Sequence, residues 1–134
     1  IINIASAAGR LVILPSAERR QQFSSPDLTL EQLEGYMKEF VAHAQEGTHQ
    51  RHGWPNTAYG VSKVGVIAMT RILARQYSGS NDAPTLMINS VDPGYCATDQ
   101  NNQQGFISAD RGAVTPFLLA TTTDFYTGLH WYQE

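Results

Sequence analysis

The chain has 134 residues and a mass of 14.8 kDa, with 42% hydrophobic and 16% charged residues. This composition is that of one ordinary globular domain, and it excludes the disordered, collagen-like and disulfide-stapled classes. A formal charge of −3 disfavours a nucleic-acid surface, and no apolar stretch reaches the roughly 20 residues of a membrane helix. A single cysteine, Cys96, excludes an intrachain disulfide and is typical of a reducing compartment, so we expect a cytoplasmic protein.

The first half of the sequence predicts one strand and two helices. Residues 1–6 (IINIAS) are rich in β-branched side chains and contain no Met, so they predict a buried strand with further elements before residue 1. Ser16 is a candidate N-cap for a short helix over residues 17–20. Thr29 and Gln32 form a capping box for a longer amphipathic helix that ends at Gly47. Residues 48–56 predict a loop.

The second half predicts a further alternation of helices and strands. The strongest helix is expected over residues 57–76, where apolar residues recur at helical spacing. A strand over residues 85–91 is followed by the turn Asp92-Pro93-Gly94, and residues 95–107 predict a polar loop. Ser108 and Asp110 open a helix that tolerates Pro116, and a last strand is expected near residues 129–132. This order predicts an α/β fold with a parallel sheet.

A tyrosine and a lysine on the strongest predicted helix are candidates for proton transfer. Tyr59 and Lys63 are four residues apart and therefore share a face of the helix. An adjacent cation favours the ionised form of a phenol while leaving the phenol able to donate a proton, which is general acid chemistry. The alternative is a surface lysine that packs over the tyrosine ring.

Two further features lie where predicted strands end, which is where ligands bind in open parallel sheets. The hydroxyl of Ser6 could hydrogen-bond a substrate carbonyl, or it could satisfy a turn. Residues 93–98 (PGYCAT) form a turn that exposes backbone groups and a hydroxyl to a flat polar ligand. Together with Tyr59 and Lys63, these residues predict a ligand site on one edge of the sheet.

The same motifs carry a resemblance to a known family. The YGVSK sequence at 59–63, the strand-ending Ser6 and the PGYCAT turn resemble the C-terminal half of a short-chain dehydrogenase/reductase. The long segment before Tyr59, the GWP at 53–55 and the DPGY at 92–95 are more similar to the monomeric NADPH-dependent carbonyl reductases. The resemblance covers nearly the whole chain. It implies a Rossmann-type α/β domain whose N-terminal half is absent, so that residues 1–134 are its C-terminal part with a helical insertion at about residues 10–55.

The resemblance also implies roles for individual residues. Ser6 would hold and polarise the substrate carbonyl, and Tyr59 would protonate that carbonyl as hydride arrives. Lys63 would bind the nicotinamide ribose and favour ionisation of Tyr59, and both residues would contact the cofactor, NADPH. The remaining contacts would be Pro93, Gly94 and Cys96 to the nicotinamide, Thr98 to the pyrophosphate and Tyr95 to the substrate.

The implied function is the reduction of ketones, aldehydes or quinones to alcohols by a monomeric protein. In this family the glycine-rich phosphate loop would precede residue 1, and the 134 residues contain no G-x-G-x-x-G. We therefore expect the isolated chain to be inactive and prone to aggregation. The alternative is a truncated or degenerate relative that is not catalytic and acts as an interaction module.

Other candidate sites are weaker. The four histidines, His43, His49, His52 and His130, lack a metal-ligand spacing and are expected to be solvated, so no metal is assigned. Ser62 lacks the glycine that a hydrolase nucleophile elbow requires at position 64. Trp54 and Trp131 are expected to be packing residues, and Cys96 a small hydrophobic one.

Overall fold

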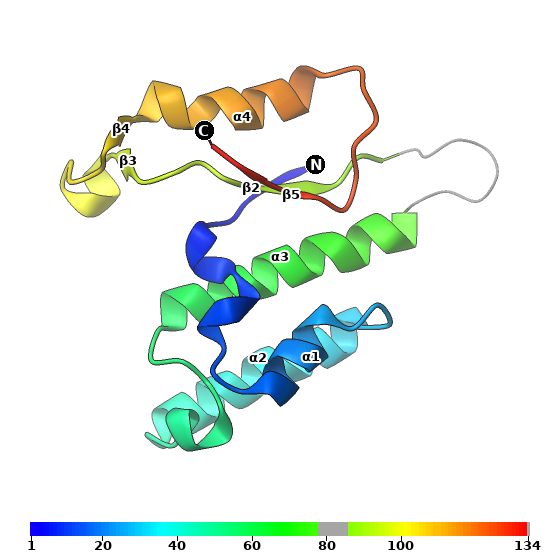
Figure 1. The fold of residues 1–134 in the computed structure, drawn as a ribbon, viewed down its shortest axis with the longest axis vertical. Helices are drawn as coiled ribbons and strands as arrows, with labels where there is room; N and C mark the ends of the chain where they lie inside the picture. Colours follow the sequence, from blue (N-terminus) through cyan, green and yellow to red (C-terminus); the bar gives the residue numbers. More distant parts are fainter. Residues whose placement is uncertain (78–85, 134) are drawn as a thin grey trace.

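A computed structural model describes residues 1–77 and 86–133, and its centre is a three-stranded parallel sheet (Figure 1). The strands are β1 (Ile2–Ile4), β2 (Asn89–Asp92) and β5 (His130–Tyr132), in the order β1-β2-β5. Val91 lies opposite Ile4 on one side and opposite Trp131 on the other. Residues Asn89, Ser90 and Val91 are buried, as expected of a central strand. The predicted class, a parallel sheet with flanking helices, is confirmed.

The sheet lies between two helices that connect its strands (Figure 1). Helix α3 (Ala58–Tyr77) leads from β1 to β2, and α4 (Ala109–Thr121) leads from β2 to β5. The predicted helix over residues 57–76 is therefore confirmed to within one residue at each end. Pro116 lies inside α4, as predicted.

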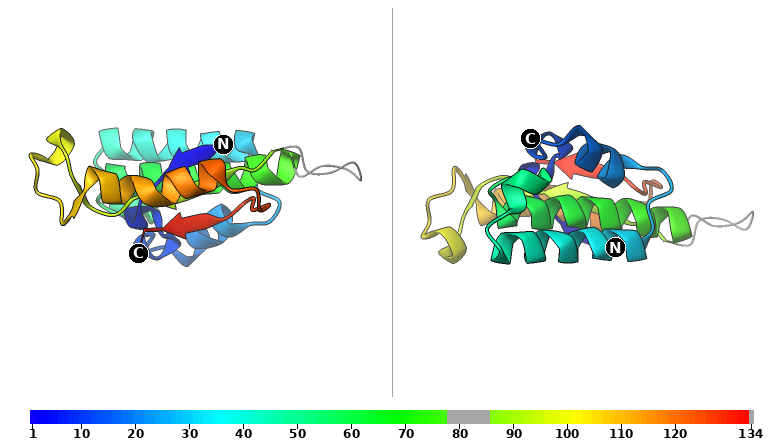
Figure 2. Two further views of the ribbon diagram at one scale, coloured as in Figure 1. Left: turned by 90° about the horizontal axis from the view of Figure 1, so that it is seen from above. Right: turned by 90° about the horizontal axis from the view of Figure 1, so that it is seen from below.

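The segment between β1 and α3 forms a third layer on the side of α3 away from the sheet (Figure 1), and seen from above and below its two helices lie on opposite sides of α3 (Figure 2). It contains the 3₁₀ turns η1 (Ala7–Gly9), η2 (Leu11–Ile13) and η3 (His49–His52) and the helices α1 (Ala17–Ser24) and α2 (Leu30–Gln45). Both predicted caps are confirmed. The Ser16 hydroxyl accepts a hydrogen bond from Arg19 N at 3.2 Å, and Thr29 and Gln32 form the predicted capping box of α2.

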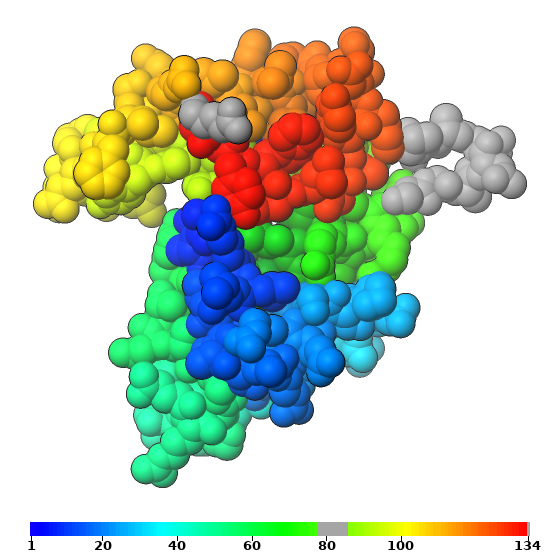
Figure 3. Space-filling model, in the orientation of Figure 1, coloured from blue at the N-terminus to red at the C-terminus, as the bar shows by residue number. Residues whose placement is uncertain are grey.

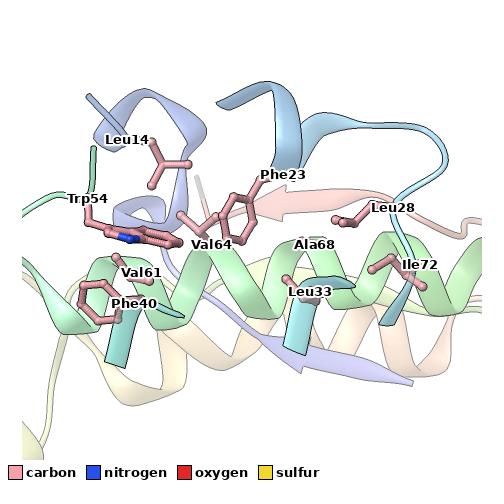
Figure 4. Close-up of a cluster of buried hydrophobic side chains, with 10 residues drawn as sticks. All are labelled: Leu14, Phe23, Leu28, Leu33, Phe40, Trp54, Val61, Val64, Ala68 and Ile72. Atoms are coloured by element: carbon pink, nitrogen blue, oxygen red, sulfur yellow. The ribbon is translucent and has the colours of Figure 1, made fainter. Parts of the chain in front are cut away.

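A cluster of buried hydrophobic side chains joins this third layer to α3 (Figure 4). Within it, Trp54 is fully buried and makes edge-to-face contacts with Phe23 and Phe40. Trp54 is therefore a packing residue, as predicted. The cluster consists of Leu14, Phe23, Leu28, Leu33, Phe40, Trp54, Val61, Val64, Ala68 and Ile72.

Two sequence predictions for the region after α3 are wrong in detail. Strand β2 begins at Asn89 rather than at residue 85, which is outside the described residues, and residues 86–88 are not in a strand. The predicted loop over residues 95–107 contains two short parallel strands, β3 (Cys96–Ala97) and β4 (Ile107–Ser108), and the 3₁₀ turn η4 (Asp99–Asn101). Strands of two residues are too short to give a periodic pattern, which explains why the sequence did not indicate them.

The prediction that the histidines are solvated is wrong for three of the four. The His43 ring stacks on His52 with centroids 3.7 Å apart, and His43 Nδ1 accepts a hydrogen bond from Trp54 Nε1. His49 is half-buried and pairs with Asn56. His130 is half-buried, and its Nδ1 lies 2.9 Å from Ser90 Oγ. These contacts join different elements, so residue spacing could not reveal them. Only His52 is exposed.

Candidate active site

Ser6 lies at the carboxyl end of β1, where it caps the turn η1. Its hydroxyl oxygen accepts a hydrogen bond from Ala8 N at 3.2 Å, so the turn role that the sequence allowed is realised. A serine hydroxyl has one proton to donate in addition to the lone pairs that accept. Ser6 is half-buried and not sealed from solvent. Its proton is therefore available to a ligand at this edge of the sheet.

Two glycines allow the turn after Ser6 to lie directly against α3. A Cβ on Gly9 would be 2.6 Å from the carbonyl carbon of Lys63, and a Cβ on Gly60 would be 3.1 Å from Ala8 O. Neither position leaves room for a side chain, so the segment after Ser6 is in contact with the helical turn that carries Tyr59 and Lys63. We did not predict that Gly9 and Gly60 allow this contact. A glycine inside a helix costs about 1 kcal/mol relative to alanine, so the presence of Gly60 in the strongest predicted helix was the signal for a close approach.

Lys63 connects α3 to the end of β1. Its Nζ donates a hydrogen bond to Ile4 O at 3.0 Å and lies 5.6 Å from the centroid of the Tyr59 ring. An ammonium group has three donors, so two remain for a ligand. Tyr59 keeps 55% of its surface exposed. The two side chains therefore lie near each other, as predicted. The ammonium group lies near the ring, which is also the contact expected of a surface lysine that packs over a tyrosine.

The turn after β2 lies next to the end of β1. Ala5 N donates to Val91 O at 2.7 Å, which aligns the two strand ends. After β2, the Asp92 carboxylate accepts a hydrogen bond from Gly94 N at 3.0 Å, and Gly94 has a φ of +79°. This left-handed conformation favours glycine. Asp92 thus fixes the turn through its side chain. The D-P-G sequence is the signal for this role, which we did not predict.

Cys96 and Thr98 follow this turn and have internal partners. The Cys96 thiol lies 3.4 Å from Pro93 O, and a Cβ on Gly112 of α4 would be only 2.2 Å from Cys96 Sγ. The backbone N of Cys96 donates to Gly94 O, and its carbonyl accepts from Asn101 Nδ2. Thr98 N donates to Asn101 Oδ1 at 3.2 Å. Cys96 therefore packs the turn onto α4, in keeping with its expected behaviour as a small hydrophobic residue.

Residues 1–77 and 86–133 contain no group of three or more His, Cys, Asp or Glu residues placed to hold a metal ion. The same residues form no helix that is long and apolar enough to cross a membrane.

The parallel sheet with flanking helices, and the position of Ser6, Tyr59 and Lys63 at its carboxyl edge, agree with the resemblance to the short-chain dehydrogenase/reductases. No family profile matches the chain. The chain is 37% identical over 131 residues to carbonyl reductase (NADPH) 1 of Oryctolagus cuniculus, covering 97% of this chain and 47% of that protein. It is 40% identical over 121 residues to carbonyl reductase (NADPH) 3 of Mus musculus, covering 90% of this chain and 44% of that protein.

A solved structure agrees with these sequence matches. The structure of salutaridine reductase from Papaver somniferum matches with a TM-score of 0.87 at 26% identity, covering 98% of this chain and 44% of that one. The resemblance to the carbonyl reductases of the short-chain dehydrogenase/reductase family is therefore confirmed. The chain spans about half the length of the curated relatives it matches, a share consistent with the expected C-terminal half.

Proposed function

We propose that the protein carrying these residues reduces carbonyl compounds (ketones, aldehydes or quinones) to alcohols, with NADPH as cofactor and Tyr59 as proton donor. The observation that carries the proposal is the contact between the turn after Ser6 and the turn of α3 that holds Tyr59 and Lys63. This contact gathers a hydroxyl, a phenol and an ammonium group at one strand end. The matches to carbonyl reductases support the same reaction class.

Each of the three side chains has a distinct task in the proposed reaction. The Ser6 hydroxyl donates a hydrogen bond to the substrate carbonyl oxygen and polarises the C=O bond. Tyr59 transfers its phenolic proton to the same oxygen, which becomes the alcohol. Lys63 uses its two remaining N–H donors to hold ribose hydroxyls and stabilises the tyrosinate that remains. NADPH, when bound, supplies the hydride that the carbonyl carbon accepts.

The donors at this edge fit the nicotinamide and ribose end of the cofactor. The ammonium of Lys63 suits hydroxyl oxygens such as those of a ribose. Pro93, Gly94 and Cys96 are proposed to contact the nicotinamide and Thr98 the pyrophosphate. Tyr95 is proposed to line the substrate pocket.

The wider proposals concern organisation and assembly. We propose that residues 1–134 are part of a single Rossmann-type domain with a helical insertion at about residues 10–55, in a cytoplasmic protein. Helix α2 packs on α3, where a Cβ on Gly65 would be 3.1 Å from Met37 Sδ. Because this contact covers the outer face of α3, the natural-length protein is proposed to be a monomer, which sedimentation would test.

The test of the catalytic proposal is a matched pair of tyrosine substitutions in the protein at its natural length. Tyr59→Phe removes the phenolic proton and keeps the ring, so turnover of an aldehyde with NADPH should fall by at least about 100-fold. Tyr77→Phe is the control because Tyr77 lies on the same helix and is 51% exposed, against 55% for Tyr59. NADPH consumption, followed by absorbance, is the measurement.

Two results would contradict the proposal in different ways. If Tyr59→Phe retains near wild-type turnover, Tyr59 is not the proton donor. If the wild-type protein reduces no aldehyde, ketone or quinone and does not bind NADPH in calorimetry, the protein is not a reductase. The second result would favour the non-catalytic interaction module that the sequence left as the alternative.

A further inference from the structure

We propose that Arg71 and Arg75 bind a phosphate group in a cavity at the amino edge of the sheet, where β2 and β5 begin. The cavity has a volume of about 370 Å³, which is within the usual range for small-molecule sites. It is lined by residues 24–26, by the second half of α3 and by Thr127 and Gly128. None of these residues belongs to the candidate active site, so this site and the proposed reductase function can be tested separately.

The cavity lies at the end of the molecule where α3 ends. Figure 1 shows this end on the right, whereas the carboxyl ends of β1 and β2 point to the left. On the face shown in Figure 3, α3 (green) is exposed between the segment that leads into β5 (red) and the segment between α1 and α2 (light blue). Gly128 N donates to Ile88 O at 2.8 Å, which ties the segment before β5 to the start of β2. A ligand bound here would leave the carboxyl edge free.

The two arginines are one turn apart on α3 and therefore share a face of the helix. Arg71 donates to Phe23 O at 2.7 Å, and Arg75 donates to the carbonyls of Pro26 and Leu28. A guanidinium has five N–H donors in a planar fork. Most of the donors of the two side chains therefore remain for a ligand in the cavity.

The positive charges of the two arginines are not compensated in the described part of the chain. Their carbonyl partners carry no net charge, and neither guanidinium forms an ion pair with a carboxylate there. Asp27 is close in sequence, but it is exposed and does not line the cavity. Burial lowers the pKa of Arg71, and the charge of Arg75 lowers it further. A bound anion would relieve this repulsion.

A serine hydroxyl adds a neutral donor to the cavity. Ser25 Oγ accepts a hydrogen bond from Asp27 N at 3.3 Å, so its own proton is free to donate. A phosphate group carries a charge of about −1.5 to −2 at pH 7 and has several strong acceptor oxygens. Because arginine forks match these oxygens and the two cations match this charge, the cavity favours a phosphate group over a neutral ligand.

Calorimetric titration of the natural-length protein with inorganic phosphate is the test. Chloride keeps the ionic strength constant, because salt screens such a site. The wild-type protein should bind phosphate saturably, and Arg75→Gln should raise the Kd at least about tenfold. Arg20→Gln is the matched control, since Arg20 also donates to two carbonyls, those of Leu14 and Pro15, but does not line the cavity. Its Kd should stay within twofold of wild type.

Two further measurements sharpen the result. Arg75→Lys keeps the charge without the fork, so its Kd should lie between those of wild type and Arg75→Gln, and it serves as the test if Arg75→Gln does not fold. Glycerol 3-phosphate, titrated in the same way, distinguishes the source of the phosphate group. Tighter binding than inorganic phosphate would identify a phosphate monoester as the ligand, and equal binding would identify the free ion.

Three results would overturn the proposal. The first is a wild-type protein that binds no phosphate saturably at constant ionic strength. The second is a Kd that Arg75→Gln and Arg75→Lys leave unchanged, because phosphate would then bind elsewhere. The third is an equal loss of binding in Arg20→Gln. In each case, Arg71 and Arg75 serve only to hold the segment between α1 and α2 against α3.

Discussion

The two sides of α3 differ in how completely they bury their apolar residues. On the outer side, α1, α2 and the turn before α3 enclose Phe23, Phe40 and Trp54, each of which is at most 7% exposed. On the sheet side, α4 leaves Val114, Phe117 and Leu118 at 51%, 70% and 59% exposure. The third layer, which is the proposed helical insertion, therefore encloses its core within these 134 residues. The sheet and α4 leave apolar surface uncovered in the same chain.

Polar contacts reinforce the same contrast. On the insertion side, Arg19 is buried, pairs with Glu39 through both terminal nitrogens and stacks over the Trp54 ring with its guanidinium carbon 4.2 Å from the centroid. Arg71 donates to Phe23 O at 2.7 Å, and Arg75 donates to the carbonyls of Pro26 and Leu28. These arginines hold the segment between α1 and α2 against α3.

The largest expected effect is the loss of the aromatic centre of the insertion. Trp54→Ala removes a fully buried ring, its contacts with Phe23 and Phe40 and its hydrogen bond to His43. The free energy of unfolding should fall by about 3–5 kcal/mol, the usual cost of truncating a large aromatic side chain in a core. Urea unfolding followed by circular dichroism is the measurement.

The matched control for this prediction is the other tryptophan. Trp131 is only half-buried in β5 and contacts Tyr126. Because less of its surface is removed from water, Trp131→Ala should cost less than half as much as Trp54→Ala. An equal or larger cost at Trp131 would show that the sheet side is packed as completely as the insertion, and the contrast drawn above would be wrong.

Local chemistry explains why the insertion was the better-predicted region. Ser16, Thr29 and Gln32 cap helices through residues at most three positions away, so the sequence reveals these helix starts directly. The site depends on distant residues. The hydrogen bond from Lys63 to Ile4 O spans 59 positions, and the contact of Gly9 with Lys63 has no local signal. The sequence could indicate which residues gather at the strand ends, but not the contacts that gather them.

A second prediction uses acid to test the ion pair in the insertion. The hydrogen bond from Arg19 lowers the pKa of Glu39 below its usual value, although burial opposes this. The folded state therefore binds this proton less readily than the unfolded state. The stabilisation is complete above the unfolded pKa of about 4.3, and it is lost as the pH falls through the lower folded value.

The substitution that tests this pair is Glu39→Gln. It leaves buried Arg19 without its carboxylate, and it should cost about 2 kcal/mol at pH 7. This figure is below the 3–5 kcal/mol of a fully buried pair because solvent reaches Glu39, which is 39% exposed. Glu34→Gln, at an exposed pair with Lys38, is the control, and its free energy of unfolding should change little.

Urea midpoints measured from pH 7 to pH 3 should show a smaller decline in Glu39→Gln than in wild type. An unchanged decline would assign the acid sensitivity to other carboxylates.

A third prediction gives the sheet side its own pH signature. Burial lowers the pKa of His130, Asp92 opposes this shift, and Arg10 adds to it. Because the folded state disfavours the protonated ring, stability should decrease as the pH falls below the unfolded value of about 6.5. In His130→Gln this decrease between pH 7.5 and pH 5.5 should be smaller than in wild type. His52→Gln, at an exposed histidine, is the comparison, and an equal flattening there would refute the assignment to His130.

The smallest effect on stability is expected on the outer face of α4, where Val114, Phe117 and Leu118 share one side of the helix. Phe117→Ser exchanges an exposed ring for a hydroxyl, so the free energy of unfolding should change by less than about 0.5 kcal/mol. Self-association of the 134-residue chain, measured by light scattering, should decrease because apolar surface is removed. Leu119→Ser is the matched control on the same helix, since Leu119 is only 4% exposed, and it should cost about 3 kcal/mol. If Phe117→Ser is as destabilising as Leu119→Ser, this face of α4 is packed in solution, and the two sides of α3 do not differ in the way that their exposure indicates.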